Sequence, residues 1–374
     1  MHISDPDLSE EQRLLASAAR AFFAERSPVG RARKLRDAED AVGFSRELWK
    51  EMAELGWVGC HLPSELGGAG LGFTELCLVL EAAGRTLVPE PFVSTSLLAA
   101  SLLVAAGEGR RLPEIARGEV VVAAAYSERG SRYDPQRIET RAAPDAAGFV
   151  LRGEKIQVLD GHVASSFIVS ARTDEQRISL FLLDASTRGI DVTRQRRIDG
   201  RNAALMRLSD VRVTQHDLVG GLHQGGEVLE HALDLAAIGL ACEMLGSARA
   251  AFELTLGHLK SRKQFGVPIG SFQALQHRAA RLYIELSLAG AAAFGAARAV
   301  DAGSHELSRL ASLAKALCSD AFVSVANEAV QMHGGIGVTD ENDIGLYLKR
   351  ARAADATFGD AAWHRARWAA LGGY

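Results

Sequence analysis

Apolar side chains recur at helical spacing through the first third of the chain. Leu48, Met52 and Leu55 lie three or four residues apart, which places their side chains on one face of an α-helix. Ser9 and Gln12 have the spacing of a capping box, in which each side chain bonds the backbone N–H group of the other residue. The pattern therefore predicts a helical N-terminal region.

The pattern changes near residue 118, where short β-branched or alternating runs begin. These runs occupy residues 120–125, 149–151, 156–159, 167–170, 178–183 and 205–213. Gly153-Glu154 and Asp160-Gly161 are typical turn residues, and we expect each pair to reverse the chain between neighbouring strands. Such runs predict an antiparallel barrel or sandwich of modest size.

Helical spacing returns near residue 226 in three long segments, 228–262, 272–302 and 307–332, and a short fourth segment follows. Amphipathic helices of this length predict a four-helix bundle. The expected fold is α+β and mainly α. Its expected domains are an N-terminal helical domain at 1–118, a middle β domain at 119–220 and a C-terminal bundle at 221–374.

Composition excludes several classes of function. The 374 residues carry a net charge of −4, which argues against a nucleic-acid partner and a basic membrane patch. Four scattered cysteines without CxxC spacing predict small buried residues in a reducing compartment and no metal site. The apolar run 92–106 is shorter than the roughly 20 residues that a bilayer requires, so it predicts a buried helix. We expect a cytoplasmic protein without a membrane span.

The segment 261–273 reads SRKQFGVPIGSFQ and leaves a long helical pattern through a turn. Arg262 places a planar guanidinium beside the amide of Gln264, a pair that suits a phosphate-bearing ligand. On chemistry alone the simpler interpretation is a helix that ends in cations, because cations favour the C-terminal end of the helix dipole.

A second segment, 331–337, reads QMHGGIG and also follows a helical run. A helix precedes its glycines, so it is not the dinucleotide fingerprint that follows a strand. By itself the pattern is typical of a helix C-cap with a tight turn. His333 alone is more typical of a local hydrogen-bonding residue, and we assign it no chemical role.

Together these two segments resemble the flavin-binding segments of the acyl-CoA dehydrogenase family, and the resemblance extends over essentially the whole chain. It implies FAD as cofactor, an acyl-CoA thioester as substrate, and an electron-transfer flavoprotein or similar acceptor. In the family a carboxylate removes a proton from the α-carbon and the flavin takes a hydride from the β-carbon. The cofactor-binding residues that the resemblance implies are Arg262, Gln264, Phe265, Gln273, Gln331, Gly334, Gly335 and Gly337.

The chain departs from the family where the catalytic base is expected. The family usually places a glutamate before a glycine in the segment after the final flavin turn, and here that position is Phe358, beside Gly359. Some relatives place the base on the first long C-terminal helix, where the matching position here is Ala236. Asp234 lies nearby but on another helix face. We therefore expect no catalytic residue in this chain.

The middle region departs as well. Where the family usually reads Thr-Glu-x-x-x-Gly-Ser-Asp, residues 127–134 read SERGSRYD. After a retained Gly-x-Lys at 153–155, Gln157 stands at the family's tryptophan position and Leu159 at its threonine or serine position.

These departures follow a pattern. In the family a dimer interface completes each flavin site, and this chain keeps the segments that reach the neighbour's flavin while losing those of its own site. The chain resembles base-lacking subunits of heteromeric enzymes, namely the small subunit of pimeloyl-CoA dehydrogenase and partner chains of steroid side-chain acyl-CoA dehydrogenases. The matching features are Tyr133-Asp134, Gln273-x-x-Gln276-His277 and Phe358-Gly359-Asp360. The resemblance implies a paralogous partner, in a dimer of heterodimers, and a role in lipid or steroid degradation.

Two alternatives remain. A homomeric flavin-dependent oxidase or monooxygenase of the same superfamily would need Asp355 or Asp360 as its functional acid, although Asp360 is also a typical N-cap for a helix starting at Ala361. A non-catalytic scaffold without flavin is the second alternative. The retained Arg262 and Gly334 segments argue against it, because a scaffold does not need them.

Overall fold

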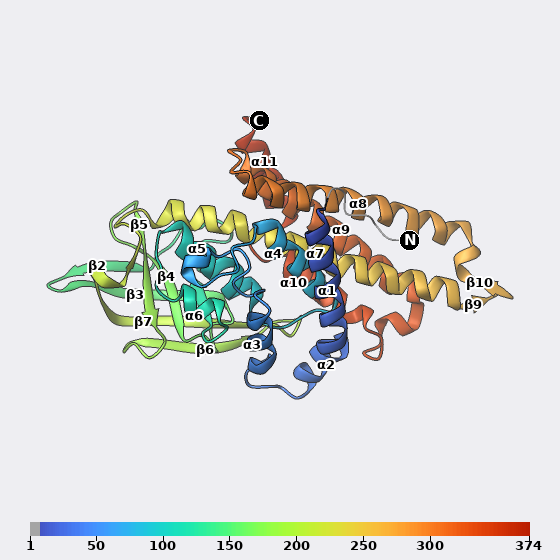
Figure 1. The fold of residues 1–374 in the computed structure, drawn as a ribbon, viewed down its shortest axis with the longest axis horizontal. Coiled ribbons are helices and arrows are strands. Elements are labelled where there is room, and N and C mark those ends of the chain that lie inside the picture. Colours follow the sequence, from blue (N-terminus) through green and yellow to red (C-terminus); the bar gives the residue numbers. More distant parts are fainter. Residues whose placement is uncertain (1–7) are drawn as a thin grey trace. The chain divides into compact units, whose positions relative to one another are not determined.

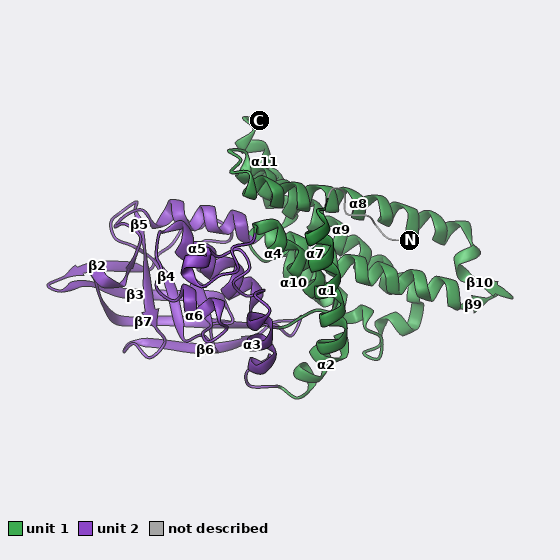
Figure 2. Ribbon diagram, in the orientation of Figure 1, with its two compact units in different colours: residues 1–39, 72–89, 237–374 green, residues 40–71, 90–236 purple. Residues whose placement is uncertain are grey.

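The computed structural model describes residues 8–374, so the first seven residues of the expected N-terminal domain lie outside it. The chain forms two compact units (Figure 2). Unit 1 comprises residues 1–39, 72–89 and 237–374, and unit 2 comprises residues 40–71 and 90–236. The three-domain division expected above follows the type of element, and its boundaries stay a prediction.

Unit 1 is helical (Figure 1). Its elements are α1 (Glu10–Arg26), α2 (Val29–Asp37), α4 (Phe73–Arg85), most of α7 (Gly225–Ser261), β9 (Lys263–Gln264), β10 (Val267–Pro268), η4 (Ile269–Ser271), α8 (Gln273–Asp301), α9 (Leu307–His333), η5 (Gly334–Val338), α10 (Ile344–Asp355) and α11 (Ala361–Leu371). The predicted capping box of α1 is confirmed, since the Gln12 N–H donates to Ser9 Oγ and the Ser9 N–H donates to Gln12 Oε1.

Helices α4 and α7 pack backbone against backbone within unit 1. A Cβ atom on Gly84 would lie 2.0 Å from the carbonyl oxygen of Glu243, and one on Gly246 would lie 1.9 Å from that of Glu81. Only glycine allows this approach. Beside the crossing, the buried carboxylate of Glu81 lies 3.2 Å from the guanidinium of Arg249, and Arg85 pairs with Glu253, so ion pairs also join the two helices.

Unit 2 combines short helices with a sheet. Its elements are α3 (Arg46–Glu54), η1 (Ser64–Leu66), the π-helix η2 (Phe92–Ala99), α5 (Ala100–Ala105), α6 (Leu112–Ala116), β1 (Val122–Ala125), β2 (Arg141–Asp145), β3 (Gly148–Leu159), β4 (Ser166–Arg172), β5 (Ile178–Asp184), β6 (Ile190–Arg196), β7 (Asn202–Thr214), η3 (Gln215–Asp217), β8 (Leu218–Val219) and the start of α7. The predicted order of helices, strands and helices is confirmed, and the run 92–106 is helical and mostly buried as expected.

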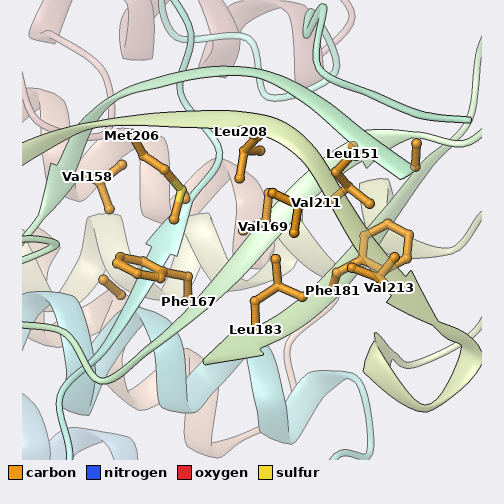
Figure 3. Close-up of a cluster of buried hydrophobic side chains, with 14 of the residues drawn as sticks. Leu151, Val158, Phe167, Val169, Phe181, Leu183, Met206, Leu208, Val211 and Val213 are labelled. Atoms are coloured by element: carbon orange, nitrogen blue, oxygen red, sulfur yellow. The ribbon is translucent and has the colours of Figure 1, made fainter. Parts of the chain in front are cut away.

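The eight strands form one open sheet in the order β6-β7-β3-β2-β4-β5-β8, with β1 pairing with β4. The sheet therefore does not close into a barrel. It is mainly antiparallel, but β1 and β2 each pair with β4 in parallel. Its buried face carries branched and aromatic side chains, which pack into one core (Figure 3).

The predicted turn at Gly153-Glu154 is wrong, because β3 continues through both residues. The register with β7 shifts between Leu151 and Gly153, which marks a β-bulge. A Cβ atom at Gly153 would lie 2.3 Å from Thr140 Oγ1, so glycine serves a close approach here and does not reverse the chain. The predicted turn at Asp160-Gly161 is confirmed.

The four cysteines are free and buried, as the sequence predicted. Among residues 8–374, no helix is long and apolar enough to cross a membrane.

Candidate functional site

The Arg262 segment forms a tight hairpin just after the end of α7. Gln264 of β9 pairs with Val267 of β10, and the two linking residues, Phe265 and Gly266, both have positive φ. Positive φ at both positions is the geometry of a type I′ hairpin, which favours glycine at the second position. The hairpin lies where α7 gives way to α8 (Figure 1).

The side chains of this hairpin face outward. Phe265 is 92% exposed, and the Arg262, Gln264 and Gln273 side chains are exposed as well. Within residues 8–374, no protein group bonds or pairs with the Arg262 guanidinium. The segment therefore presents a cation that is unpaired within residues 8–374 and a largely exposed aromatic ring, which contacts Phe272 edge-on, to a ligand or a partner chain.

The glycine segment caps α9. Gly334 has φ +65° and ψ −143°, a conformation that favours glycine, and its N–H donates to the carbonyl oxygen of Gln331, whose side chain is exposed. A Cβ atom on Gly334 or Gly335 would meet nothing within 4 Å, whereas one on Gly337 would lie 2.6 Å from the carbonyl oxygen of Val330. Packing thus explains Gly337 and the cap explains Gly334. Gly335 also faces open space, and no contact within residues 8–374 requires a glycine there.

Stacked imidazoles join the two segments. His258, one helical turn before Arg262, stacks on His333, which immediately precedes Gly334, and the ring centroids are 4.3 Å apart. Burial lowers the pKa of His258, and the neighbouring His333 and Arg262 lower it further. The structure therefore brings the Arg262 hairpin and the glycine loop to the same end of the helices of unit 1. His258 was not predicted as a site residue, because no sequence pattern marks it.

Phe358 lies in a strained turn between α10 and α11. Phe358 has φ +60° and Gly359 has φ +111°. Lys315 of α9 is fully buried, and its ammonium donates to the carbonyl oxygens of Asp355 at 3.0 Å and Gly359 at 2.8 Å. The Nε2 N–H of buried His364 donates to the carbonyl oxygen of Phe358 at 3.0 Å.

The groups that hold this turn have shifted pKa values. Burial lowers the pKa of Lys315 to about 8, although the carboxylate of Asp355 opposes the shift. Burial and the nearby Lys315 lower the pKa of His364 to about 3, so this imidazole is neutral at pH 7. The sequence analysis missed both residues, since a lysine or histidine in a helix carries no signal that it is buried.

The two candidate acids of the turn bond to its backbone. Asp360 accepts from the Trp363 N–H at 2.8 Å, which confirms the expected N-cap of α11. Asp355 accepts from the Ala361 N–H at 3.2 Å. Position 358 itself carries a partly buried benzyl group, which cannot accept a proton.

The other base position also lacks a carboxylate. Ala236 is fully buried in α7, and Asp234 is 4% exposed and has partners within the chain.

In unit 2 the retained motif residues build the scaffold and the altered ones face outward. The ammonium of Lys155, which is fully buried, lies 2.7 Å from the carboxylate of Glu128 and donates to Ser170 Oγ at 3.1 Å. Glu128 also accepts from two backbone N–H groups, those of residues 139 and 140. Gln157 is exposed and has φ +54°, and Leu159 is partly buried. Glu128 and Lys155 thus pack inside unit 2, whereas the side chain of Gln157 is on its surface.

Family models for acyl-CoA dehydrogenases match almost the whole chain. The N-terminal domain model matches residues 9–119, the middle domain model residues 123–211 and the C-terminal domain model residues 223–371. The chain belongs to the acyl-CoA dehydrogenase family. All the segments described above lie within the matched regions or directly beside them.

Similar proteins include one sequence relative and two solved complexes. Acyl-CoA dehydrogenase IpdE2 of Mycolicibacterium smegmatis is 30% identical over 94% of this chain and 96% of its own length. A chain of the Tcur3481–Tcur3483 steroid ACAD is 31% identical, with a TM-score of 0.88 over 97% of this chain and 98% of that one. A chain of the ChsE4–ChsE5 complex of Mycobacterium tuberculosis is 25% identical, with a TM-score of 0.89 over 100% and 99%.

Proposed function

We propose that this chain is a subunit of an FAD-dependent acyl-CoA dehydrogenase, that it lacks the catalytic glutamate, and that it completes the FAD site of a base-bearing partner. The observation that carries the proposal is the contrast between two parts of unit 1. Arg262 and Gly335 are exposed, and no contact within residues 8–374 requires either of them, whereas position 358 is occupied by phenylalanine. A chain that binds no flavin does not need Arg262 and Gly335 in these exposed positions. A chain with a complete active site needs a carboxylate at position 358 or position 236.

The residues present fit the adenosine diphosphate part of FAD. The Arg262 guanidinium would pair with the pyrophosphate, and the bare backbone at Gly334 and Gly335 allows a phosphate or ribose to approach closely. Bound FAD supplies the hydride acceptor for oxidation of the acyl chain. The proton acceptor has to come from the partner, because neither position 358 nor position 236 of this chain carries a carboxylate.

Exposed apolar side chains support a protein partner. Ile284 and Leu288, one helical turn apart on α8, are 57% and 58% exposed, and Phe265 is 92% exposed. Isolated apolar residues are common on surfaces, but a helical pair and an outward phenyl ring beside a ligand segment are typical of an interface. Two solved relatives are named as pairs of proteins, ChsE4–ChsE5 and Tcur3481–Tcur3483. A paralogous chain is therefore the partner that we propose, with an electron-transfer flavoprotein or similar acceptor.

The homomeric oxidase alternative is less well supported. It requires Asp355 or Asp360 as the functional acid, and both carboxylates accept backbone hydrogen bonds that hold the turn and the start of α11.

Co-expression tests the proposal. The chain is purified alone and with a base-bearing paralogue, and flavin absorbance per protein and acyl-CoA oxidation with an artificial electron acceptor are measured. We expect weak flavin retention and no turnover from the chain alone, and turnover from the complex. The matched control is the same complex with the partner's glutamate replaced by glutamine, which should retain flavin without turnover. Robust turnover from the isolated chain would overturn the proposal.

A further inference from the structure

The stacked rings of His258 and His333 form a contact between the Arg262 hairpin and the glycine loop. Side-chain packing alone does not explain this stack. The ring planes differ by 25° and their centroids are 4.3 Å apart. His333 is 9% exposed, and its Nδ1 donates to the carbonyl oxygen of Ala329 at 2.8 Å. This hydrogen bond fixes the orientation of the His333 ring and places a proton on its Nδ1, because a carbonyl oxygen can only accept. Within residues 8–374, no protein group bonds Nε2 of His333.

Each imidazole is coupled to one segment through the backbone. The carbonyl oxygen of His258 accepts from the Arg262 N–H at 2.8 Å, which closes the last turn before the hairpin. His333 is the last residue of α9, and Gly334 follows it directly. The stack therefore joins the end of α7, which leads into the hairpin, to the end of α9, which leads into the glycine loop.

We infer that His258 and His333 are a positioning pair, which holds the Arg262 hairpin against the glycine loop through the stacking of their rings and releases it when His258 is protonated. The identification of the ligand as FAD rests on the proposed function. The positioning of the two segments by the stacked rings does not depend on that function. His258 and His333 are not assigned any contact with the ligand itself.

The sign of the pH effect follows from the charges around His258. Among residues 8–374, Arg262, directly after the end of α7, and His333 on α9 are the charged or titratable groups that act on it, and both oppose a positive charge there. Burial acts in the same direction and is the largest cause of the lowered pKa. A histidine with a depressed pKa favours the packed arrangement fully above its ordinary value of about 6.5. This preference is lost progressively as the pH falls below that value.

The first test measures FAD retention by the reconstituted complex between pH 5.5 and 8. His258→Ala removes the stack, and it should weaken retention about three- to tenfold at pH 7.5, the range expected for one aromatic pair. His258→Phe keeps a stacking ring without a proton, so it should retain FAD and lose the acid sensitivity of the wild type. His305→Phe, at an exposed histidine, is the matched control and should behave as the wild type.

Two outcomes of this test would overturn the inference. Equal retention by His258→Ala and the wild type would show that the stack positions nothing. Tighter binding at pH 5.5 than at pH 7.5, lost in His258→Phe, would make His258 a cationic contact of the ligand.

The second test needs no flavin. Hydrogen–deuterium exchange of amides 334–338 is measured in the full chain without FAD. Exchange should be faster in His258→Ala and unchanged in His258→Phe. Unchanged exchange in His258→Ala would contradict the positioning role even if FAD retention falls. Faster exchange in a chain that never binds FAD in any complex would support the stack and reject the proposed function, so the two failures are distinguishable.

Discussion

Lys315 donates a hydrogen bond to the carbonyl oxygen of Gly359 at 2.8 Å, and this contact ties the turn at residue 358 to the interior of α9. The same ammonium donates to Ser319 Oγ and to the carbonyl oxygen of Asp355. Lys315 therefore fixes the backbone of the turn that carries residue 358, although that residue is a phenylalanine. Under the proposed function, position 358 lacks the reacting carboxylate while Lys315 still holds the backbone of its turn.

Lys315→Met should destabilise unit 1 by about 2–4 kcal/mol, because it leaves two buried carbonyl oxygens with one donor fewer. The loss should grow from pH 7 to pH 9.5. Burial lowers the pKa of Lys315 to about 8, so above that pH the unfolded chain binds more protons than the folded one and the contribution of Lys315 rises with pH. Urea unfolding at both pH values measures it. Lys349→Met is the matched control, and an equal loss at both positions would contradict the role of Lys315.

Phe358→Glu should leave the turn in place, because Lys315 and His364 hold it through backbone atoms. The variant should still be inactive as a homomer, because Gln157 and Leu159 stand where the family has the residues beside the flavin ring, and misplacement by about 1 Å can reduce a rate ~100-fold. A partly buried carboxylate should also lower the stability by about 1–3 kcal/mol. Flavin bleaching by an acyl-CoA in this homomer would show that the middle region is competent.

Arg262→Ala in the reconstituted complex should lower FAD affinity by about one to two orders of magnitude, the effect of losing a charge-assisted contact of roughly 1.5–3 kcal/mol. Lys260→Ala removes the same charge from an exposed position in the last turn of α7 and is the control. Flavin absorbance per protein after gel filtration gives the result. If both variants lose flavin equally, general electrostatics and not a specific contact explains the effect.

Gly335→Ala separates ligand approach from folding. Its Cβ would meet nothing within 4 Å, so the melting temperature should stay within about 2 °C of the wild type, as for most surface changes. FAD retention should fall about tenfold, because the methyl group keeps a phosphate from the backbone N–H groups. Gly334→Ala should instead lower the melting temperature, since φ is +65° there. Unchanged FAD retention in Gly335→Ala would remove the glycine loop from the proposed site.

The long helices were predictable because their apolar spacing persists over many turns, and α7, α8 and α9 begin and end within a few residues of the expected positions. Strands β2 and β6 were missed because few of their side chains are buried. Gly153 was wrongly predicted to lie in a turn, because a β-bulge and a turn both favour glycine for its backbone freedom. The hydrogen bond of Lys315 to Gly359 and the contact of His258 with His333 depend on segments far apart in sequence, which no local pattern contains. His364 bonds a residue only six positions away, but its burial was not visible in the sequence.

The crossing of α4 and α7 determines where this chain can be divided. Gly84 and Gly246 bring the two backbones together, so α4 is completed by a helix that is synthesised much later. A fragment that ends near residue 118 would expose the bare backbone at Gly84 and the apolar side chains that α4 buries in the whole chain. Such a fragment and its complement should be recovered together when they are co-expressed, and the fragment alone should be degraded. Unit 1 therefore cannot finish folding until α7, which follows α4 by more than a hundred residues, has been synthesised.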